Sequence, residues 1–162
     1  MNLSILYCVL LANLISLSKA CSCFQATLND LLCSSDFVLI GTVIDGKCSE
    51  ELTDDGDVRC GTQSYELNLE AVIKSNDPTI VNEGMETVTV VTPGSSSLCG
   101  IKLISGASHI VSGNFATSGI AAGETPQLAL NMCNSAVRSH VRPRDLVKVK
   151  SILKTCQQNV FS

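Results

Sequence analysis

The sequence predicts an all-β domain with a minor helical part, in which five strands form a small closed barrel between one early and one late helix. Several short runs of β-branched residues are separated by turn residues, as in small β domains. Apolar residues recur at helical spacing near residue 30 and again near residue 150. Neither a linker nor an internal repeat is visible, so we expect residues 21–162 to form a single domain.

The early helix and the first strand follow from apolar patterning at the start of this domain. Leu28, Leu31 and Leu32 lie at helical spacing, which predicts a short helix over 26–32. Residues 37–44 are rich in β-branched and other apolar side chains, and predict a buried strand.

A polar loop and a second strand come next. Residues 47–61 are polar and acidic, and the Asp-Asp-Gly-Asp sequence within them is typical of a turn. Residues 63–74 alternate between apolar and polar side chains, which predicts a half-buried strand. The apolar members of that strand are Tyr65, Leu67, Leu69 and Ala71.

The second half of the chain supplies the other strands and the late helix. Strands are expected over 86–92, 109–113 and 128–132, with loops over 75–84 and 119–126 and a mixed segment over 95–106. Residues 143–156 predict a helix, since Pro143 suits a first helical position and an apolar stripe follows it. The stripe consists of Leu146, Val149, Ile152, Leu153 and Cys156.

An apolar run of 15 residues, Leu3 to Leu17, precedes the domain. It is shorter than the ~20 residues that span a bilayer, and the following Ser18-Lys19-Ala20 has the small residues of a cleavage site. We therefore predict a signal peptide over 1–20 and a secreted, extracellular protein, the alternative being an uncleaved anchor. We expect no membrane span in the rest of the chain.

The cysteines support the same interpretation. Of the nine Cys, Cys8 lies in the predicted signal peptide, so cleavage leaves an even number, as an oxidised secreted domain requires. Cys21 then becomes the N-terminal residue. Cys21 and Cys23 are too close in sequence to bond easily to each other, so each is expected to pair with a distant Cys, but the spacing does not decide which. The eight are Cys21, Cys23, Cys33, Cys48, Cys60, Cys99, Cys133 and Cys156.

Composition argues against two other classes of protein. Eleven Lys and Arg against 15 Asp and Glu give no sign of the basic face that a nucleic-acid binder needs. His109 and His140 have no neighbouring Cys cluster or HExxH motif, and no nucleophile, base and orienting group come together, so we expect neither an enzyme nor a cofactor of its own.

An acidic stretch lies between the first two expected strands. It lacks the ligand spacing of an EF-hand, so a solvated hairpin tip is expected there rather than a calcium site. The acidic residues are Glu50, Glu51, Asp54, Asp55 and Asp57.

Several motifs follow one another in an order that resembles a known family. The motifs are Cys21-Ser22-Cys23, LCSSDFV at 32–38, QSYEL at 63–67, SSLCG at 96–100, HIVSG at 109–113, LNMC at 130–133 and the helix ending at Cys156. Together they resemble the tissue inhibitors of metalloproteinases over essentially the whole of residues 21–162. The resemblance implies the inhibitory N-terminal domain alone, as in short invertebrate members.

What the resemblance implies about structure agrees with the strand count above. The family's fold is a netrin-like, OB-type five-stranded barrel. The resemblance implies disulfides Cys21–Cys99, Cys23–Cys133 and Cys33–Cys156, and with these Cys48–Cys60 as the remaining pair.

The resemblance also implies a mechanism and a set of contact residues. The free amine and carbonyl of Cys21 would chelate the catalytic zinc of a secreted or membrane-anchored zinc metalloproteinase, with Ser22 in its specificity pocket. The chain would act as a monomer. The remaining protease-contacting residues would be Cys23, Phe24, Gln25, Ser97, Leu98 and Cys99.

One departure from the family leaves a second function open. Family members commonly have a small apolar residue and then Pro where this chain has Phe24-Gln25. This difference slightly favours the alternative, a non-inhibitory netrin-like binding module that acts on an extracellular receptor or matrix protein.

Overall fold

The computed structural model describes residues 21–53, 57–80, 86–116 and 127–158, which form a mostly-β structure with two α-helices. The predicted combination of strands with one early and one late helix is confirmed. The strands are β1 (Phe37–Leu52), β2 (Val58–Ser75), β3 (Thr87–Pro93), β4 (Ser108–Ala116), β5 (Gln127–Ala129) and β6 (Val137–Ser139). The helices are α2 (Leu28–Ser34) and α3 (Pro143–Gln158), with short 3-10 turns η1 (Pro78–Ile80) and η2 (Ser96–Leu98).

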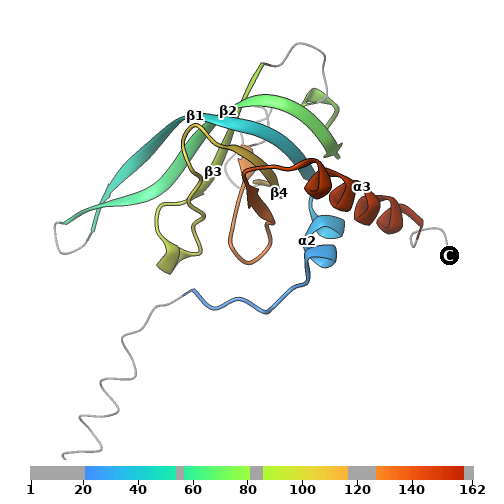
Figure 1. Ribbon diagram of the computed structural model, residues 1–162. Helices are drawn as coiled ribbons and strands as arrows, with labels where there is room; N and C mark the ends of the chain where they lie inside the picture. Colours follow the sequence, from blue (N-terminus) through green and yellow to red (C-terminus); the bar gives the residue numbers. More distant parts are fainter. Residues whose placement is uncertain (1–20, 54–56, 81–85, 117–126, 159–162) are drawn as a thin grey trace, which may run out of the picture.

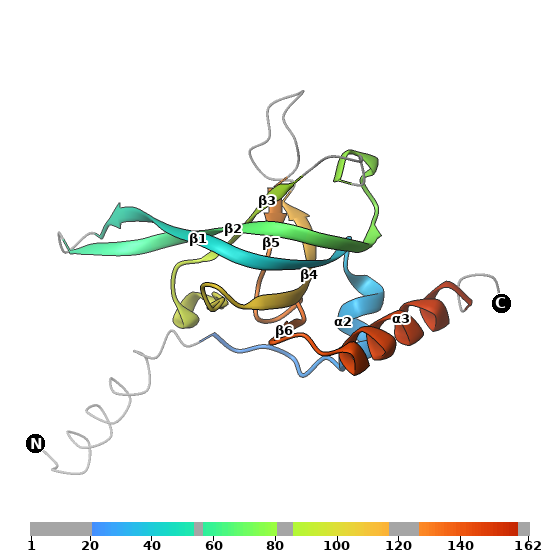
Figure 2. The ribbon, with the colours of Figure 1, turned by 45° about the horizontal axis from the view of Figure 1, so that its top comes forward.

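The strands pair in the order β1-β2-β3-β5-β4-β6, and β1 also pairs with β4. Five strands therefore form a ring of hydrogen-bonded neighbours (Figures 1 and 2). All pairings are antiparallel except that of β3 with β5. β6 pairs with the first half of β4, on the edge opposite β1.

The start of β1 is buried on both faces, which explains its uninterrupted apolar run. Phe37 and Leu39 point into the core inside the strand ring. Val38 and Ile40 point the other way, into a second core that also contains Leu32 of α2. Because successive side chains of a strand alternate between faces, burial of both faces requires a continuous apolar run rather than alternation.

The predicted polar loop over 47–61 is wrong for most of its length. β1 and β2 continue through it as a two-stranded arm, in register from Lys47 with Ser64 to Leu52 with Val58 (Figure 1). The side chains of the arm are mostly exposed, so its sequence has no apolar pattern. Backbone pairing between the two strands and the Cys48–Cys60 disulfide hold the arm instead.

Several other expectations need correction. The early helix is displaced by two residues at each end from the predicted 26–32. Ala71 is exposed, because the register with β1 shifts between Ile40 and Gly41 and reverses the faces of β2 from that point. The fifth strand ends at Ala129, and the predicted loop over 119–126 lies outside the described residues.

A sixth strand, β6, was not predicted. It has only three residues, too few for an alternating pattern to be visible. It adds to β4 with the register His109–Ser139, Ile110–Arg138 and Val111–Val137.

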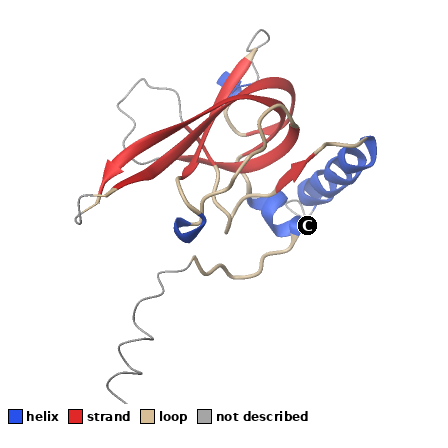
Figure 3. Cartoon of the chain, turned by 60° about the vertical axis from the view of Figure 1, so that its left-hand side comes forward, coloured by secondary structure: helices blue, strands red, loops and turns tan. Residues whose placement is uncertain are grey.

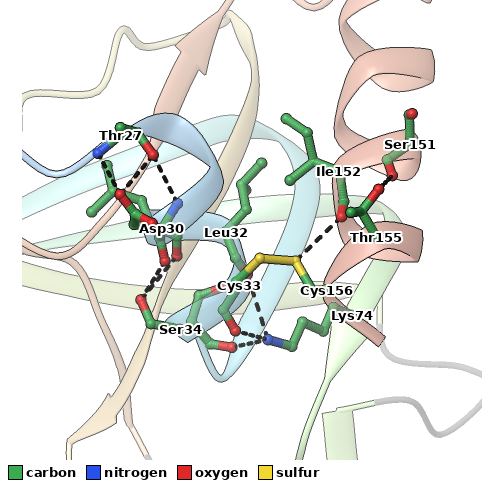
Figure 4. The surroundings of a disulfide bond; sticks show 12 residues. Thr27, Asp30, Leu32, Cys33, Ser34, Lys74, Ser151, Ile152, Thr155 and Cys156 are labelled. Carbon is green, nitrogen blue, oxygen red and sulfur yellow. Dashed lines mark hydrogen bonds between the residues drawn. A yellow bond between two sulfur atoms is a disulfide. The ribbon is translucent and has the colours of Figure 1, made fainter. Parts of the chain in front are cut away.

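α2 and α3 pack beside each other and are joined by the Cys33–Cys156 disulfide (Figure 4). Lys74, at the end of β2, donates hydrogen bonds from Nζ to the carbonyl oxygens of Leu32, Cys33 and Ser35. These carbonyls belong to the C-terminal end of α2, where no backbone N–H remains to satisfy them. Burial of the ammonium group lowers the pKa of Lys74, an effect that nearby Asp36 partly offsets.

We expect Lys74→Met to lower the free energy of unfolding by about 1–2 kcal/mol, because three helix-end carbonyls lose their charged donor. Urea denaturation with the disulfides intact measures this change. Lys47→Met is the matched control, since its ion pair with Asp45 is exposed and we expect a change within about 0.5 kcal/mol. Equal denaturation midpoints for the two variants would contradict the proposed role of Lys74 as a helix cap.

Candidate functional site

The candidate site is the N-terminal segment 21–27, which has no regular secondary structure and runs across one end of the molecule to α2 (Figure 2). Two disulfides hold its start. Cys21 is bonded to Cys99, which directly follows η2, and Cys23 is bonded to Cys133, in the turn that follows β5. The Cα–Cα distances of these bridges are 5.2 and 5.1 Å. Figure 3 shows the start of the segment beside η2.

The two bridges lie against each other. The Sγ atom of Cys21 is 3.7 Å from that of Cys23 and 3.8 Å from that of Cys133, and the Sγ atoms of Cys99 and Cys133 are 3.5 Å apart. All four sulfurs lie within 4.8 Å of one another, close enough for a metal–thiolate cluster. Because each sulfur is oxidised in a disulfide, none is a thiolate that binds a metal. The group is therefore a pair of packed disulfides that fixes the start of the segment.

Cys99 and Cys133, to which the segment is bonded, both lie in hydrogen-bonded turns. Cys99 has a φ of 66°, in the left-handed region that is uncommon for residues other than Gly. Its N–H donates to the carbonyl of Ser96 at 3.1 Å, and its own carbonyl accepts from the N–H of Met132 at 2.9 Å. The N–H of Cys133 donates to the side-chain oxygen of Asn131 at 2.9 Å. The η2 loop and the turn after β5 are thus joined by a backbone hydrogen bond as well as through the disulfides.

Large apolar side chains are exposed around this pair of disulfides. Phe24 is 94% exposed, Leu98 57% and Met132 49%. Each of them is the chain neighbour of a bridged Cys, so the bridges bring three separate parts of the sequence together. Exposed apolar groups that cluster in this way are typical of a surface that binds a partner.

The far end of the segment is fixed by the N-terminal cap of α2. The Thr27 hydroxyl accepts from the N–H of Asp30 at 3.2 Å, and the Asp30 carboxylate accepts from the N–H of Thr27 at 3.0 Å. This reciprocal pair is a capping box. The Thr27 hydroxyl also donates to the Asp30 carboxylate at 2.6 Å. This hydrogen bond, followed by the one from the Thr27 N–H, lowers the pKa of the Asp30 carboxyl. The segment is therefore held at both ends, with Ser22, Phe24 and Gln25 exposed between them.

The four disulfides of the structure are the pairs that the family resemblance implied. Around two of them the structure brings together all the residues singled out for protease contact: Ser22 to Gln25 on one side, and Ser97 to Cys99 on the other. Met132 was missed. Its position next to Cys133 was the available signal, because a residue beside a bridged Cys is carried to the same place.

Among the described residues, neither histidine belongs to a cluster that could hold a metal. His109 is fully buried; its Nε2 atom lies 3.2 Å from the N–H nitrogen of Ile104 and its Nδ1 atom 3.1 Å from the Ser139 hydroxyl. His109 is therefore a core histidine with a hydrogen-bond partner at each ring nitrogen. His140 is exposed. Of the acidic stretch, Glu50, Glu51 and Asp57 lie exposed on the arm, whereas positions 54 and 55 lie outside the described residues.

The strand ring, the helix pair and the disulfide-held N-terminal segment together define a class of disulfide-bonded β protein. A family model described as "Tissue inhibitor of metalloproteinase" matches residues 19–134. The chain therefore belongs to this family, whose members are extracellular inhibitors and not enzymes. A search of curated proteins gives no match. β6 and α3 lie beyond the matched residues.

Within the residues that the structure describes, we find no helix that is both long and apolar enough to cross a membrane. The four disulfides are those of an oxidising environment.

Proposed function

We propose that this chain, cleaved after Ala20, inhibits zinc metalloendopeptidases of the matrix metalloproteinase type by chelating their catalytic zinc through Cys21. The observation that carries the proposal is the position of Cys21, which lies at the start of an exposed segment and is tied by a disulfide to Cys99 in a member of this inhibitor family. The fold would be the netrin-like, OB-type barrel, acting as a monomer with no cofactor of its own.

The chemistry of a free N-terminus suits this role. A catalytic zinc site has three protein ligands and one position open to water. An α-amino group has a pKa near 8, roughly, so it loses its proton at neutral pH at little cost. Its nitrogen and the carbonyl oxygen of Cys21 form a five-membered chelate ring on the metal. Binding in this way displaces the water that the protease uses as its nucleophile.

The geometry around Cys21 reduces the cost of ordering the inhibitor. The two packed disulfides and the cap of α2 hold segment 21–27 at both ends before any partner arrives. Binding then immobilises few additional groups, which favours high affinity. In this arrangement Ser22 enters the specificity pocket next to the zinc, while Cys23, Phe24 and Gln25 follow the substrate cleft.

A second contact comes from the η2 loop. Ser97 and Leu98 are exposed beside Cys99, so they would occupy the part of the cleft on the other side of the zinc. Met132 extends the same apolar surface. Phe24 and Gln25 replace the small apolar residue and Pro common in the family, and they are expected to affect which proteases are bound rather than the chelation.

The test is a titration of a matrix metalloproteinase catalytic domain with the secreted, oxidised protein. Intact mass must first show that the chain begins at Cys21. We expect activity to fall to zero at one equivalent of inhibitor, with no effect on a serine protease, which has no zinc to chelate. Full metalloproteinase activity at a large excess of correctly cleaved protein would overturn the proposal and favour the non-inhibitory binding module.

A further inference from the structure

Four cysteine sulfurs meet at the start of segment 21–27, beside the η2 loop (Figure 3). They are the Sγ atoms of Cys21, Cys23, Cys99 and Cys133, which all lie within 4.8 Å of one another. The other two bridges, Cys33–Cys156 and Cys48–Cys60, belong to no comparable cluster of ligand side chains within the described residues. The four-cysteine cluster therefore differs from the rest of the disulfide framework in what its sulfurs can do when they are thiols.

The sulfurs that are not bonded to each other already have the spacing of a tetrahedral zinc site. Zn²⁺ bound by four thiolates has Zn–S distances of about 2.3 Å, which places neighbouring sulfurs about 3.8 Å apart. The Sγ atom of Cys21 is 3.7 Å from that of Cys23 and 3.8 Å from that of Cys133, and those of Cys99 and Cys133 are 3.5 Å apart. In the reduced chain, a tetrahedral site therefore forms when the two bonded pairs move apart.

Two of the four sulfurs are held in place by backbone hydrogen bonds that do not involve the disulfides. The carbonyl of Cys99 accepts from the N–H of Met132 at 2.9 Å, which joins the η2 loop to the turn after β5. Within this turn, the N–H groups of Cys133 and Ser135 both donate to Asn131, each at 2.9 Å. β3 and β5, which precede the loop and the turn, also pair with each other. Cys99 and Cys133 thus form half of the site whether or not they are oxidised.

The other two sulfurs come from one short stretch of chain. Cys21 and Cys23 are half-buried, whereas Ser22 between them is exposed. Side chains two residues apart in an extended chain lie on the same side, so both sulfurs can reach one ion. The spacing that makes a bond between these two cysteines unfavourable therefore suits their binding to a common metal.

We propose that the chain binds one Zn²⁺ through the thiolates of these four cysteines before its disulfides form. Every Cys is a thiol when the protein is made, and disulfides form afterwards in an oxidising compartment. The four thiols release four protons when they bind the ion, and no electron is transferred. Four thiolates in a tetrahedron are the ligand set typical of Zn²⁺.

The ion would guide disulfide formation and then leave. Eight free cysteines can pair in roughly a hundred ways, whereas four held on one ion can pair with one another in only a few. Oxidation of the four thiolates gives the two bridges, passes four electrons to a disulfide-exchange oxidoreductase and releases Zn²⁺, because disulfide sulfur is not a thiolate ligand. The mature, oxidised protein therefore keeps no metal at this position.

Titration of the reduced chain with Co²⁺, a spectroscopic substitute for Zn²⁺, tests the site. The protein that begins at Cys21 is reduced with a phosphine, which becomes the phosphine oxide with oxygen from water as each disulfide becomes two thiols. We expect one equivalent of Co²⁺ to give the intense visible bands of a tetrahedral thiolate complex, and Zn²⁺ to displace it. The oxidised protein should give no such bands. Their absence from the reduced chain as well would overturn the proposal.

Two double variants locate the site. Cys23→Ser with Cys133→Ser removes two ligands, whereas Cys48→Ser with Cys60→Ser removes the same number of thiols from the β1–β2 arm. We expect the first pair of changes to weaken Zn²⁺ binding by at least about a hundredfold and the second to leave it unchanged. Equal affinities of the two variants would show that the ion is bound elsewhere.

Alkylation of the reduced natural chain identifies the ligands without any substitution, so it does not depend on how the variants fold. With one equivalent of Zn²⁺, the four cysteines of the cluster should be alkylated several-fold more slowly than the other four, as mapped by mass. Equal protection of all eight would contradict the site. None of these measurements uses a protease, so their outcome is independent of the proposed inhibitory function.

Reoxidation of the reduced chain tests the guiding role. One equivalent of Zn²⁺ should raise the yield of protein with all four native bridges, and a chelator added with the ion should cancel the gain. The arm variant, which keeps the cluster, should show the same gain in its three remaining bridges. Equal yields with and without Zn²⁺ would rule out a role for the ion in disulfide pairing.

Discussion

One alanine added before Cys21 is expected to abolish inhibition of a matrix metalloproteinase. The extension converts the basic α-amino nitrogen into an amide, which does not donate a lone pair to zinc, and it places an extra residue where the metal would lie. Removal of a central contact of this kind costs about 4 kcal/mol or more, roughly a thousandfold in the inhibition constant. Titrating the same catalytic domain with both chains measures the loss.

The control for this experiment carries the same alanine after Ser162, at the other end of the sequence. Both chains should have four disulfides by mass and the same far-ultraviolet circular dichroism spectrum. Acetylation of the Cys21 amine should have the same effect as the extension, because it also forms an amide. Inhibition by the extended chain at the level of the unextended one would rule out chelation through the N-terminus and would leave the exposed apolar surface as the binding element.

The sequence predicts those parts of the fold in which burial leaves a pattern. The start of β1 is an uninterrupted apolar run because both of its faces are covered, and the stripe of α3 follows from one covered face. The β1–β2 arm has no such pattern. Its side chains are exposed, and its pairing depends on backbone hydrogen bonds that any sequence except Pro provides.

The candidate site was predictable to a similar, limited degree. The family resemblance pointed to Cys21 and its neighbours, and these residues do lie together in the structure. The left-handed conformation of Cys99 could not be predicted from the sequence, since Cys has no preference for it. Met132 lies in a turn where the sequence predicted the end of a strand.

Alanine substitutions at two phenylalanines, one buried and one exposed, distinguish an effect on stability from an effect on inhibition. Phe37 is fully buried, and its ring centroid lies 5.9 Å from that of Phe115. Phe37→Ala is expected to lower the free energy of unfolding by about 3–5 kcal/mol, because the surrounding core does not fill the cavity that the ring leaves. Guanidinium denaturation with the disulfides intact measures this loss as a lower midpoint at constant slope.

Phe24→Ala makes the same chemical change at a side chain that is 94% exposed. We expect its free energy of unfolding to change by less than about 0.5 kcal/mol, and its inhibition constant to rise roughly tenfold because a contact in the cleft is lost. The folded fraction of Phe37→Ala should inhibit normally, since Phe37 is fully buried and offers no surface to a partner. If Phe24→Ala instead lowered stability as much as Phe37→Ala, segment 21–27 would be part of the core rather than a binding element. If both variants inhibited like the natural chain, Phe24 would lie outside the protease contact.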